Sequence, residues 1–309
     1  MTKRRLFVPR GTPSPTLKHI VTALMMAFAI SAPVFGASPL TPQSSTDNDW
    51  ELKVLTGDFT FTSENDVYLY GIKRAIDGAT FLTLTPQGQS LNITGKPVHF
   101  SQIARDELNK PESVIKVSPN VTNRDQTITW NPAITVDWDN DNWLTLGYFD
   151  PPRRFLTIDN RDGQSPQSGA ITMIFNGDIT LNAALHQAYY DTSHQIPQVF
   201  AILNNARAVF NGEVNIGLKN YDGGKKDVIG VSLDDGSSLR FNQSVTMNLI
   251  GNTVFNSAAM IVQGGSTLES SSESTLRVGL TNLDSDNPGQ GSTLSGLWVK
   301  GGTVDLRGF

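Results

Sequence analysis

The chain has 309 residues and 38% hydrophobic content, which is enough to bury a sizeable core and argues against wholesale disorder. Charged residues make up 17%, against about 25% in an ordinary soluble protein, and glycine and proline are not enriched as in a collagen-like chain. Cysteine is absent, which excludes disulfides, a thiolate nucleophile and a Cys-ligated metal site.

Residues 1–37 have the pattern of a secretory signal peptide. They contain five basic side chains and no acidic one, then an apolar run over Ile20–Ala32 and the small residues Gly36 and Ala37. Because spanning a bilayer needs about 20 apolar residues, this run is too short for a permanent anchor, which remains the weaker alternative. We predict cleavage after Gly36 or Ala37 and export across the inner membrane.

Removal of this segment changes the charge balance. It leaves 19 Lys and Arg against 29 Asp and Glu, a net charge of −10. Phosphate binding needs clustered basic side chains, and the adjacent basic pairs that remain are isolated from one another. We therefore expect no nucleic-acid partner.

Composition divides the remaining chain near residue 168, since fourteen of sixteen prolines and four of five tryptophans precede that point. We predict a less regular, β-rich N-terminal region over 38–167 and a second region over 168–309. Residues Ser101–Lys110 are the one expected helical segment. The strands expected in the first region are Trp50–Leu55, Phe59–Thr62, Val67–Tyr70, Phe81–Thr85 and Leu91–Thr94.

Residues 168–309 contain a degenerate repeat of about thirty residues. The pattern Ile-Phe-Asn-Gly-Asp-Ile-Thr-Leu at 174–181 recurs at 209–216 and, more weakly, at 241–247. A second element, Gly-Ser-Ser/Thr-Leu, begins at Gly236, Gly265 and Gly291. Short repeats rich in Thr, Ser, Asn, Gly and Val indicate a β-solenoid of about five rungs.

In such a solenoid each strand pairs with the next rung about 4.8 Å away, and every second side chain points inward. The apolar residues of successive repeats should therefore stack in columns. We expect the Asn and Gly after each Phe to form a corner, because both residue types tolerate left-handed backbone. An antiparallel sandwich is the alternative, and it would not align these columns. The three predicted sets are Phe175, Ile179 and Leu181, then Phe210, Val214 and Ile216, then Phe241, Val245 and Met247.

The signal peptide, the lack of cysteine and the string Gly-Ser-Ser-Leu-Arg-Phe-Asn at 236–242 resemble the N-terminal passenger region of Gram-negative autotransporters of the adhesin type. The resemblance covers 168–309, with 50–100 compatible, and implies a right-handed parallel β-helix displayed at the cell surface in a full-length relative. The family's outer-membrane barrel is expected in such a relative and is missing here, because too few residues follow Thr303 to supply its hairpins.

The aromatic residue Phe309 is similar to the last residue of outer-membrane barrels, but one strand makes no barrel. Residues 304–307 instead match 239–241 within a rung. The resemblance therefore implies a passenger fragment, such as the non-functional product of a truncated gene, which would be periplasmic if the chain ends at Phe309.

Candidate metal-ligating and nucleophilic residues are few. Beyond the signal peptide the histidines are His99, His186 and His194, and the last two are eight residues apart rather than the four of a helical zinc pair. Neither Gly-x-Ser-x-Gly nor Gly-Asp-Ser-Gly occurs. We expect no metal site and no nucleophilic serine.

Asp137, Asp139 and Asp141 alternate as in a calcium-binding loop. That loop needs Gly at its sixth place and Glu at its twelfth, where this sequence has Asn142 and Tyr148. A solvated turn is the favoured interpretation.

Paired carboxylates are the catalytic groups of many polysaccharide-cleaving enzymes. Asp234 with Asp235, or Asp284 with Asp286, are the candidate pairs, and their Gly, Ser, Asn and Pro neighbours favour solvated loops instead. The glycosylation sequons at Asn92 and at 120–122 are read as coincidence.

Taken together, the sequence predicts an all-β protein that folds as a right-handed parallel β-helix and has no cofactor. The expected role is non-enzymatic adhesion or aggregation, with a glycan, host matrix or a second copy as partner. The alternative is a secreted, polysaccharide-active β-helix lyase or hydrolase. Unpaired backbone at a final rung would also favour self-association or proteolysis.

Overall fold

The protein is described by a computed structural model, in which every described element is a β-strand. The predicted signal peptide and the segment expected to be helical beyond Ser101 lie outside the described residues. These residues are 53–61, 67–70, 80–101, 113–119, 124–138, 154–162, 165–166, 169–185, 198–220, 229–251, 257–272, 274–282 and 294–307.

The strands form three parallel sheets, and each rung contributes one strand to sheet A, then one to sheet B, then one to sheet C, except the last, whose described strands are β24 in sheet A and β25 in sheet B. Sheet A contains β1 (Lys53–Leu55), β4 (Thr80–Leu84), β7 (Ser113–Val117), β10 (Arg154–Asp159), β15 (Gln198–Leu203), β18 (Ile229–Leu233), β21 (Ser257–Gln263) and β24 (Leu294–Lys300). Sheet B contains β2 (Phe59–Phe61), β5 (Ser90–Gly95), β8 (Gln126–Trp130), β13 (Ile171–Phe175), β16 (Arg207–Phe210), β19 (Ser238–Phe241), β22 (Thr267–Ser270) and β25 (Thr303–Asp305). Sheet C contains β3 (Val67–Tyr70), β6 (Val98–Ser101), β9 (Ile134–Trp138), β14 (Ile179–Leu185), β17 (Val214–Asn220), β20 (Val245–Gly251) and β23 (Leu276–Asn282).

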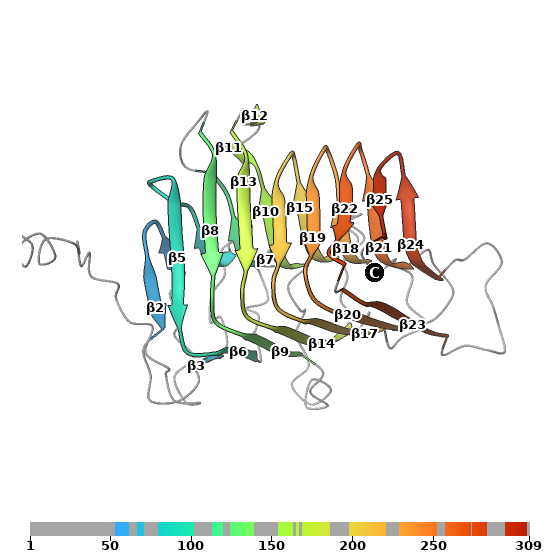
Figure 1. The fold of residues 1–309 in the computed structure, drawn as a ribbon. Helices are drawn as coiled ribbons and strands as arrows, with labels where there is room; N and C mark the ends of the chain where they lie inside the picture. Colours follow the sequence, from blue (N-terminus) through green and yellow to red (C-terminus); the bar gives the residue numbers. More distant parts are fainter. Residues whose placement is uncertain are drawn as a thin grey trace, which may run out of the picture. The chain divides into compact units, whose positions relative to one another are not determined.

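Neighbouring strands in each of these sheets come from consecutive rungs, so sheet B runs in chain order from blue β2 to red β25 in Figure 1. This arrangement confirms the predicted parallel β-helix and excludes the antiparallel sandwich. A small antiparallel hairpin, β11 (Arg161–Asp162) with β12 (Ser165–Pro166), is inserted between β10 and β13. The right-handed sense stays a prediction.

The three sheets continue through the composition shift near residue 168. Strands β7, β8 and β9 precede it and pair with β10, β13 and β14 of the following rung. The five strands expected before residue 100 are also confirmed, as β1 to β5. The N-terminal region therefore belongs to the same helix of rungs as the repeats.

The predicted columns of apolar side chains are confirmed in register. Phe175 pairs with Phe210 and Phe210 with Phe241, and their rings stack with centroids 4.9 and 5.4 Å apart. In sheet C the predicted partners likewise align, with Leu181 opposite Ile216 and Ile216 opposite Met247. Inward-facing residues of all three sheets thus build one continuous core.

The corner between sheets B and C is built differently from our expectation. Asn176, Gly177, Asn211 and Gly212 lie there, as predicted, but none of them has a positive φ. The asparagine amides instead form a ladder, in which Asn211 Nδ2 donates to Asn176 Oδ1 at 2.7 Å and Asn242 Nδ2 donates to Asn211 Oδ1 at 2.7 Å. The asparagines are needed for their side chains rather than for left-handed backbone.

The glycines of this corner are required by close approach of the backbone. A Cβ atom on Gly212 would lie 2.5 Å from the carbonyl oxygen of Gly177 in the previous rung. Of the residues with positive φ, Gly95 lies at the B–C corner, at the end of β5, and the others lie at the opposite corner, between sheets A and B. They are Asn204, Asn205, Asp235, Gly236, Gly264, Gly265 and Gly301.

Replacing Asn211 with alanine is expected to lower the free energy of unfolding by about 1 kcal/mol, because two hydrogen bonds of the amide ladder are lost at an exposed position. Urea denaturation monitored by circular dichroism measures the change. Asn215→Ala, on the outer face of β17, is the matched control and should cost less. Equal losses in the two variants would contradict a stabilising role for the ladder.

The second repeat element is confirmed for its first two copies, since Leu239 pairs with Leu268 in sheet B. Its third copy was wrong, because Leu294 pairs with Ser257 in sheet A, and Val304 is the residue that follows Leu268. A Gly-Ser-Thr string favours a turn before a strand, but it does not indicate to which of the three sheets that strand belongs. The predicted match of residues 304–307 with the rung at 239–241 is confirmed by the same pairing.

The last described rung is less well covered than the others. At the C-terminal ends of sheets C and A, the inward-facing Leu280 of β23 and Val299 of β24 are 40% and 45% exposed, whereas their partners one rung earlier, Leu249 and Val262, are buried. Strands β23, β24 and β25 each lie at the end of a sheet, so one edge of each has no partner strand within the described residues.

Candidate functional site

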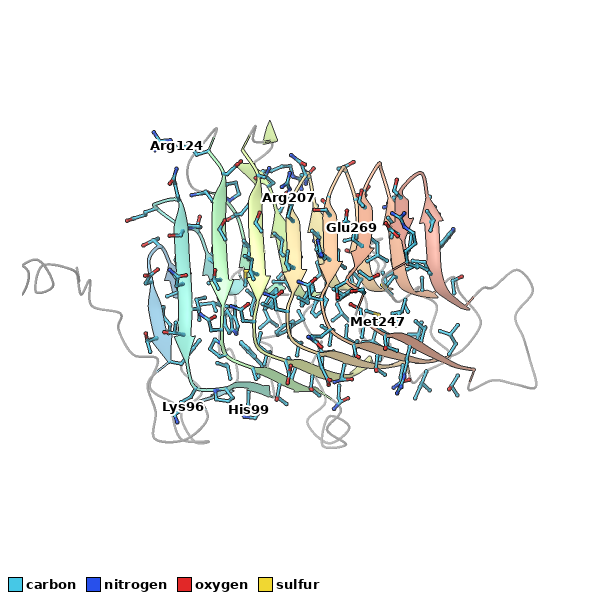
Figure 2. All side chains as sticks on the ribbon, in the orientation of Figure 1. Lys96, His99, Arg124, Arg207, Met247 and Glu269 are labelled. Carbon is cyan, nitrogen blue, oxygen red and sulfur yellow. The ribbon has the colours of Figure 1, made fainter. Side chains whose placement is uncertain are left out.

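Of the three candidate histidines, His99 alone lies within the described residues. His99 lies in β6 between the buried residues Val98 and Phe100, so its half-buried side chain is on the outer face of sheet C (Figure 2). His186 and His194 lie outside the described residues. Among the residues that are described, no three His, Asp or Glu side chains are close enough together to hold a metal ion.

Of the alternating aspartates, Asp137 lies in β9 and pairs with Asn182 of β14. Asp139 and Asp141 lie outside the described residues, as do Asn142 and Tyr148. The structure therefore places the start of this segment in a strand of sheet C, and the solvated turn beyond it stays a prediction.

Asp234 and Asp235 lie in the turn between β18 and β19 rather than on a sheet face. Asp234 Oδ1 accepts a hydrogen bond from the backbone N–H of Asp235, and Asp234 Oδ2 accepts one from Gln263 Nε2 at 2.8 Å. Both oxygens of the Asp234 carboxylate are therefore engaged, one with the backbone of its own turn and the other with Gln263 in the next rung. Asp284 and Asp286 lie outside the described residues.

The sequon residue Asn92 lies in β5, and its Nδ2 donates a hydrogen bond to Asp58 Oδ1 at 3.1 Å. The amide nitrogen is thus engaged with the preceding rung. The second sequon, at 120–122, falls outside the described residues.

The middle of the outer face of sheet A, over β10, β15 and β18, is closed to solvent. Its outward side chains Thr157, Ala201 and Ser232 are 2% exposed or less. Further along the same face, Ile261 and Trp298 belong to a second apolar cluster. A large ligand therefore has no access to these positions.

The outer face of sheet B is mixed in character. One row contains Thr172, Arg207 and Ser238 on successive rungs. The row beside it changes along the chain from uncharged polar residues to apolar residues and then to charged residues. The members of that second row, from β5 to β25, are Asn92, Thr129, Ile174, Val209, Arg240, Glu269 and Asp305.

At the end of this row Asp305 forms an ion pair with Arg307, with Arg307 Nη2 2.6 Å from Asp305 Oδ2. The hydrogen bonds that Arg307 donates lower the pKa of Asp305 from 3.8 to about 2.

The pKa of Asp305 is lower in the folded chain than the unfolded value of 3.8, so its ionised form stabilises the folded chain at pH values above 3.8. This contribution is lost as the pH falls toward 2. Carboxyl ¹³C NMR should therefore show Asp305 titrating near pH 2. Arg307→Gln should return the midpoint toward 3.8, and an unchanged midpoint would contradict the pairing.

The outer face of sheet C carries two uncharged rows over β14, β17 and β20, one of polar side chains and one in which two asparagines flank a glycine. Thr180, Asn215 and Thr246 form one row, and Asn182, Gly217 and Asn248 form the other. The first row continues to Thr135 in β9 and ends on Arg277 in β23.

Sequence reasoning named no binding residues, although the alternation in Ile179-Thr180-Leu181-Asn182 already places Thr180 and Asn182 outward. What the sequence could not provide was the register that aligns these residues over several rungs.

Comparisons with protein-family models, with curated proteins and with solved structures found no match for this chain. No helix long and apolar enough to cross a membrane occurs in the described part of the chain.

Proposed function

We propose that this chain is an exported, autotransporter-like passenger that acts without catalysis, in adhesion or aggregation through the outer surface of its β-helix. The observation that carries the proposal is the register of outward polar side chains over successive rungs of sheet C. A β-helix repeats the same surface at each rung, so many weak contacts act together and avidity replaces a single deep site.

The placement of Asp234 and Asp235, the candidate pair that lies within the described residues, supports a binding role over the polysaccharide-cleaving alternative. A cleaving enzyme needs one carboxyl group as proton donor and a second as base or nucleophile, within about 5–10 Å on an accessible face. Asp234 is instead held by Gln263 and by the backbone of its own turn.

Adhesion is tested with the chain coupled to fluorescent beads, applied to surfaces coated with neutral polysaccharides, heparin or extracellular-matrix protein. We expect retention on at least one coated surface, or clumping of the beads, and no increase in reducing ends when polysaccharide is supplied in solution. Beads that neither adhere nor clump, or release of reducing sugars, would contradict the proposal.

Self-association is expected at the ends of the sheets formed by β23 and β24, where Leu280 and Val299 expose apolar side chains beside strand edges that have no partner among the described residues. Analytical ultracentrifugation should show a sedimentation coefficient that rises with concentration. The double variant Leu280→Lys with Val299→Lys should reduce this rise, because edge lysines oppose strand pairing. Val209→Lys, on the outer face of β16 in the interior of sheet B, is the matched control and should leave the rise unchanged.

A further inference from the structure

We propose that the outer face of sheet C, from β9 to β20, is a binding surface for a neutral polysaccharide. This inference rests on the proposed adhesive function and deepens it, since it names the face and the class of ligand. Three features of the face carry it: unoccupied hydrogen-bonding groups, their alignment on consecutive rungs, and the absence of charge in the two outward rows between β14 and β20.

Polar side chains of the β-helix fall into two groups. The corner asparagines, including Asn176 and Asn211, use their amides on one another in the ladder. By contrast, no hydrogen bond within the described part of the chain occupies the side chains of Thr180, Asn215 and Thr246. These groups are half-buried, hence restricted in conformation, and they retain donors and acceptors for a ligand.

The second row adds amide groups that are held along the sheet. Asn182 and Asn248 are exposed, and each is followed in the next rung by a glycine, Gly217 or Gly279. The Oδ1 atom of Asn182 lies 2.9 Å from the position that a Cβ of Gly217 would occupy. The missing side chains therefore leave room for the amides to lie over the following strand, beside the threonine row.

Consecutive rungs repeat about every 4.8 Å, so hydroxyl and amide groups recur along the helix axis at a fixed interval. An extended polymer of hydroxylated units presents complementary donors and acceptors at regular intervals as well. Such a ligand can contact several rungs at once, and each added rung contributes to avidity.

Charge selects a neutral polymer over an anionic one. The two rows over β14, β17 and β20 contain no charged residue, and the charged positions beside them are Asp137, which continues the second row in β9, and Lys219 in β17. The rows of sheet B, by contrast, contain Arg207, Arg240 and Glu269. The chain after residue 37 also has a net charge of −10, which repels polyanions such as sulfated glycans.

The test compares two sets of three isosteric substitutions, each removing hydroxyls from one row while keeping the β-branched shape. The sheet C variant is Thr135→Val with Thr180→Val and Thr246→Val. The matched control is Thr127→Val with Thr172→Val and Thr267→Val, on the outer face of sheet B. The probes are chitin, cellulose and mannan-coated beads, with heparin beads as the anionic polymer, and the full chain is exported by a bacterial host.

We expect the unchanged chain to bind at least one neutral polymer more tightly than heparin. The sheet C variant should raise the apparent dissociation constant at least tenfold, and the control should stay within about twofold. A variant with serine at the three sheet C positions should retain binding, which separates loss of hydroxyls from loss of folding.

Equal effects of the two valine sets, or tighter binding to heparin, would overturn the assignment of the surface and leave the adhesive function standing. Adhesion to matrix protein or self-association without any polysaccharide binding would do the same. A chain that adheres to nothing would overturn both.

Discussion

Truncation of Phe210 to alanine is expected to lower the free energy of unfolding by about 3–5 kcal/mol, the range for large-to-small changes at buried aromatic positions. Phe210 is 1% exposed and lies between Phe175 and Phe241, with Phe200 of sheet A 5.6 Å away between ring centroids. Its removal therefore leaves a cavity that three neighbouring rings line. Because each rung contacts only its neighbours, the change also weakens the coupling between the rungs on either side.

Urea denaturation followed by far-UV circular dichroism measures this effect. Val209→Ala is the matched control, since Val209 precedes Phe210 in β16 and faces outward. We expect it to cost about 1 kcal/mol or less. A loss for Phe210→Ala no greater than that of the control would show that the aromatic column does not stabilise the helix of rungs.

Replacing Gly212 with alanine is expected to cost about 2–3 kcal/mol, although it adds a single methyl group. The added Cβ would lie 2.5 Å from the carbonyl oxygen of Gly177 and 2.7 Å from the backbone nitrogen of Asp178. Both contacts are to backbone, so no side chain can rotate away and the spacing between the two rungs must increase. The adjoining amide ladder would be strained by the same displacement.

Gly88→Ala is the control, because nothing lies within 4 Å of the Cβ that it would add and its φ is not positive. We expect its midpoint of thermal unfolding to be unchanged or slightly higher, since alanine restricts the unfolded chain more than glycine does. If Gly212→Ala left the thermal midpoint unchanged, close backbone approach would not be the reason for glycine at this corner.

The proposed binding surface on sheet C could be predicted only in part from the local pattern of apolar and polar residues. Alternation of apolar and polar residues in β14 and β17 indicates which side chains face outward, so Thr180 and Asn215 are readable as surface residues. Whether they belong to a common row depends on pairing between strands 35 residues apart. Burial is less readable still, because Thr157 and Ser232 occupy outward positions of sheet A and are nevertheless closed to solvent.

Pairing between strands distant in sequence also explains why no repeat was recognised in the N-terminal half. Corner asparagines in successive rungs are separated by 31 residues for Asn211 and Asn242, by 35 for Asn176 and Asn211, and by 45 for Asn131 and Asn176. The longest interval includes the inserted hairpin β11–β12. A repeat search therefore fails before residue 168, although Trp130 occupies the same position in its rung as Phe175.

The amino-acid sequence alone determined the strand class, the parallel stacking of rungs and the partners within the Phe175, Phe210 and Phe241 column, because these follow from period-two alternation and a repeat of nearly constant length. The tertiary structure decided that the helix extends back to β1, that Val304 rather than Leu294 continues the column of Leu268, and which faces are open. These features depend on which strands pair across long distances in the sequence and on which segments cover each sheet face. Side-chain alternation, by contrast, is a local property of a single strand.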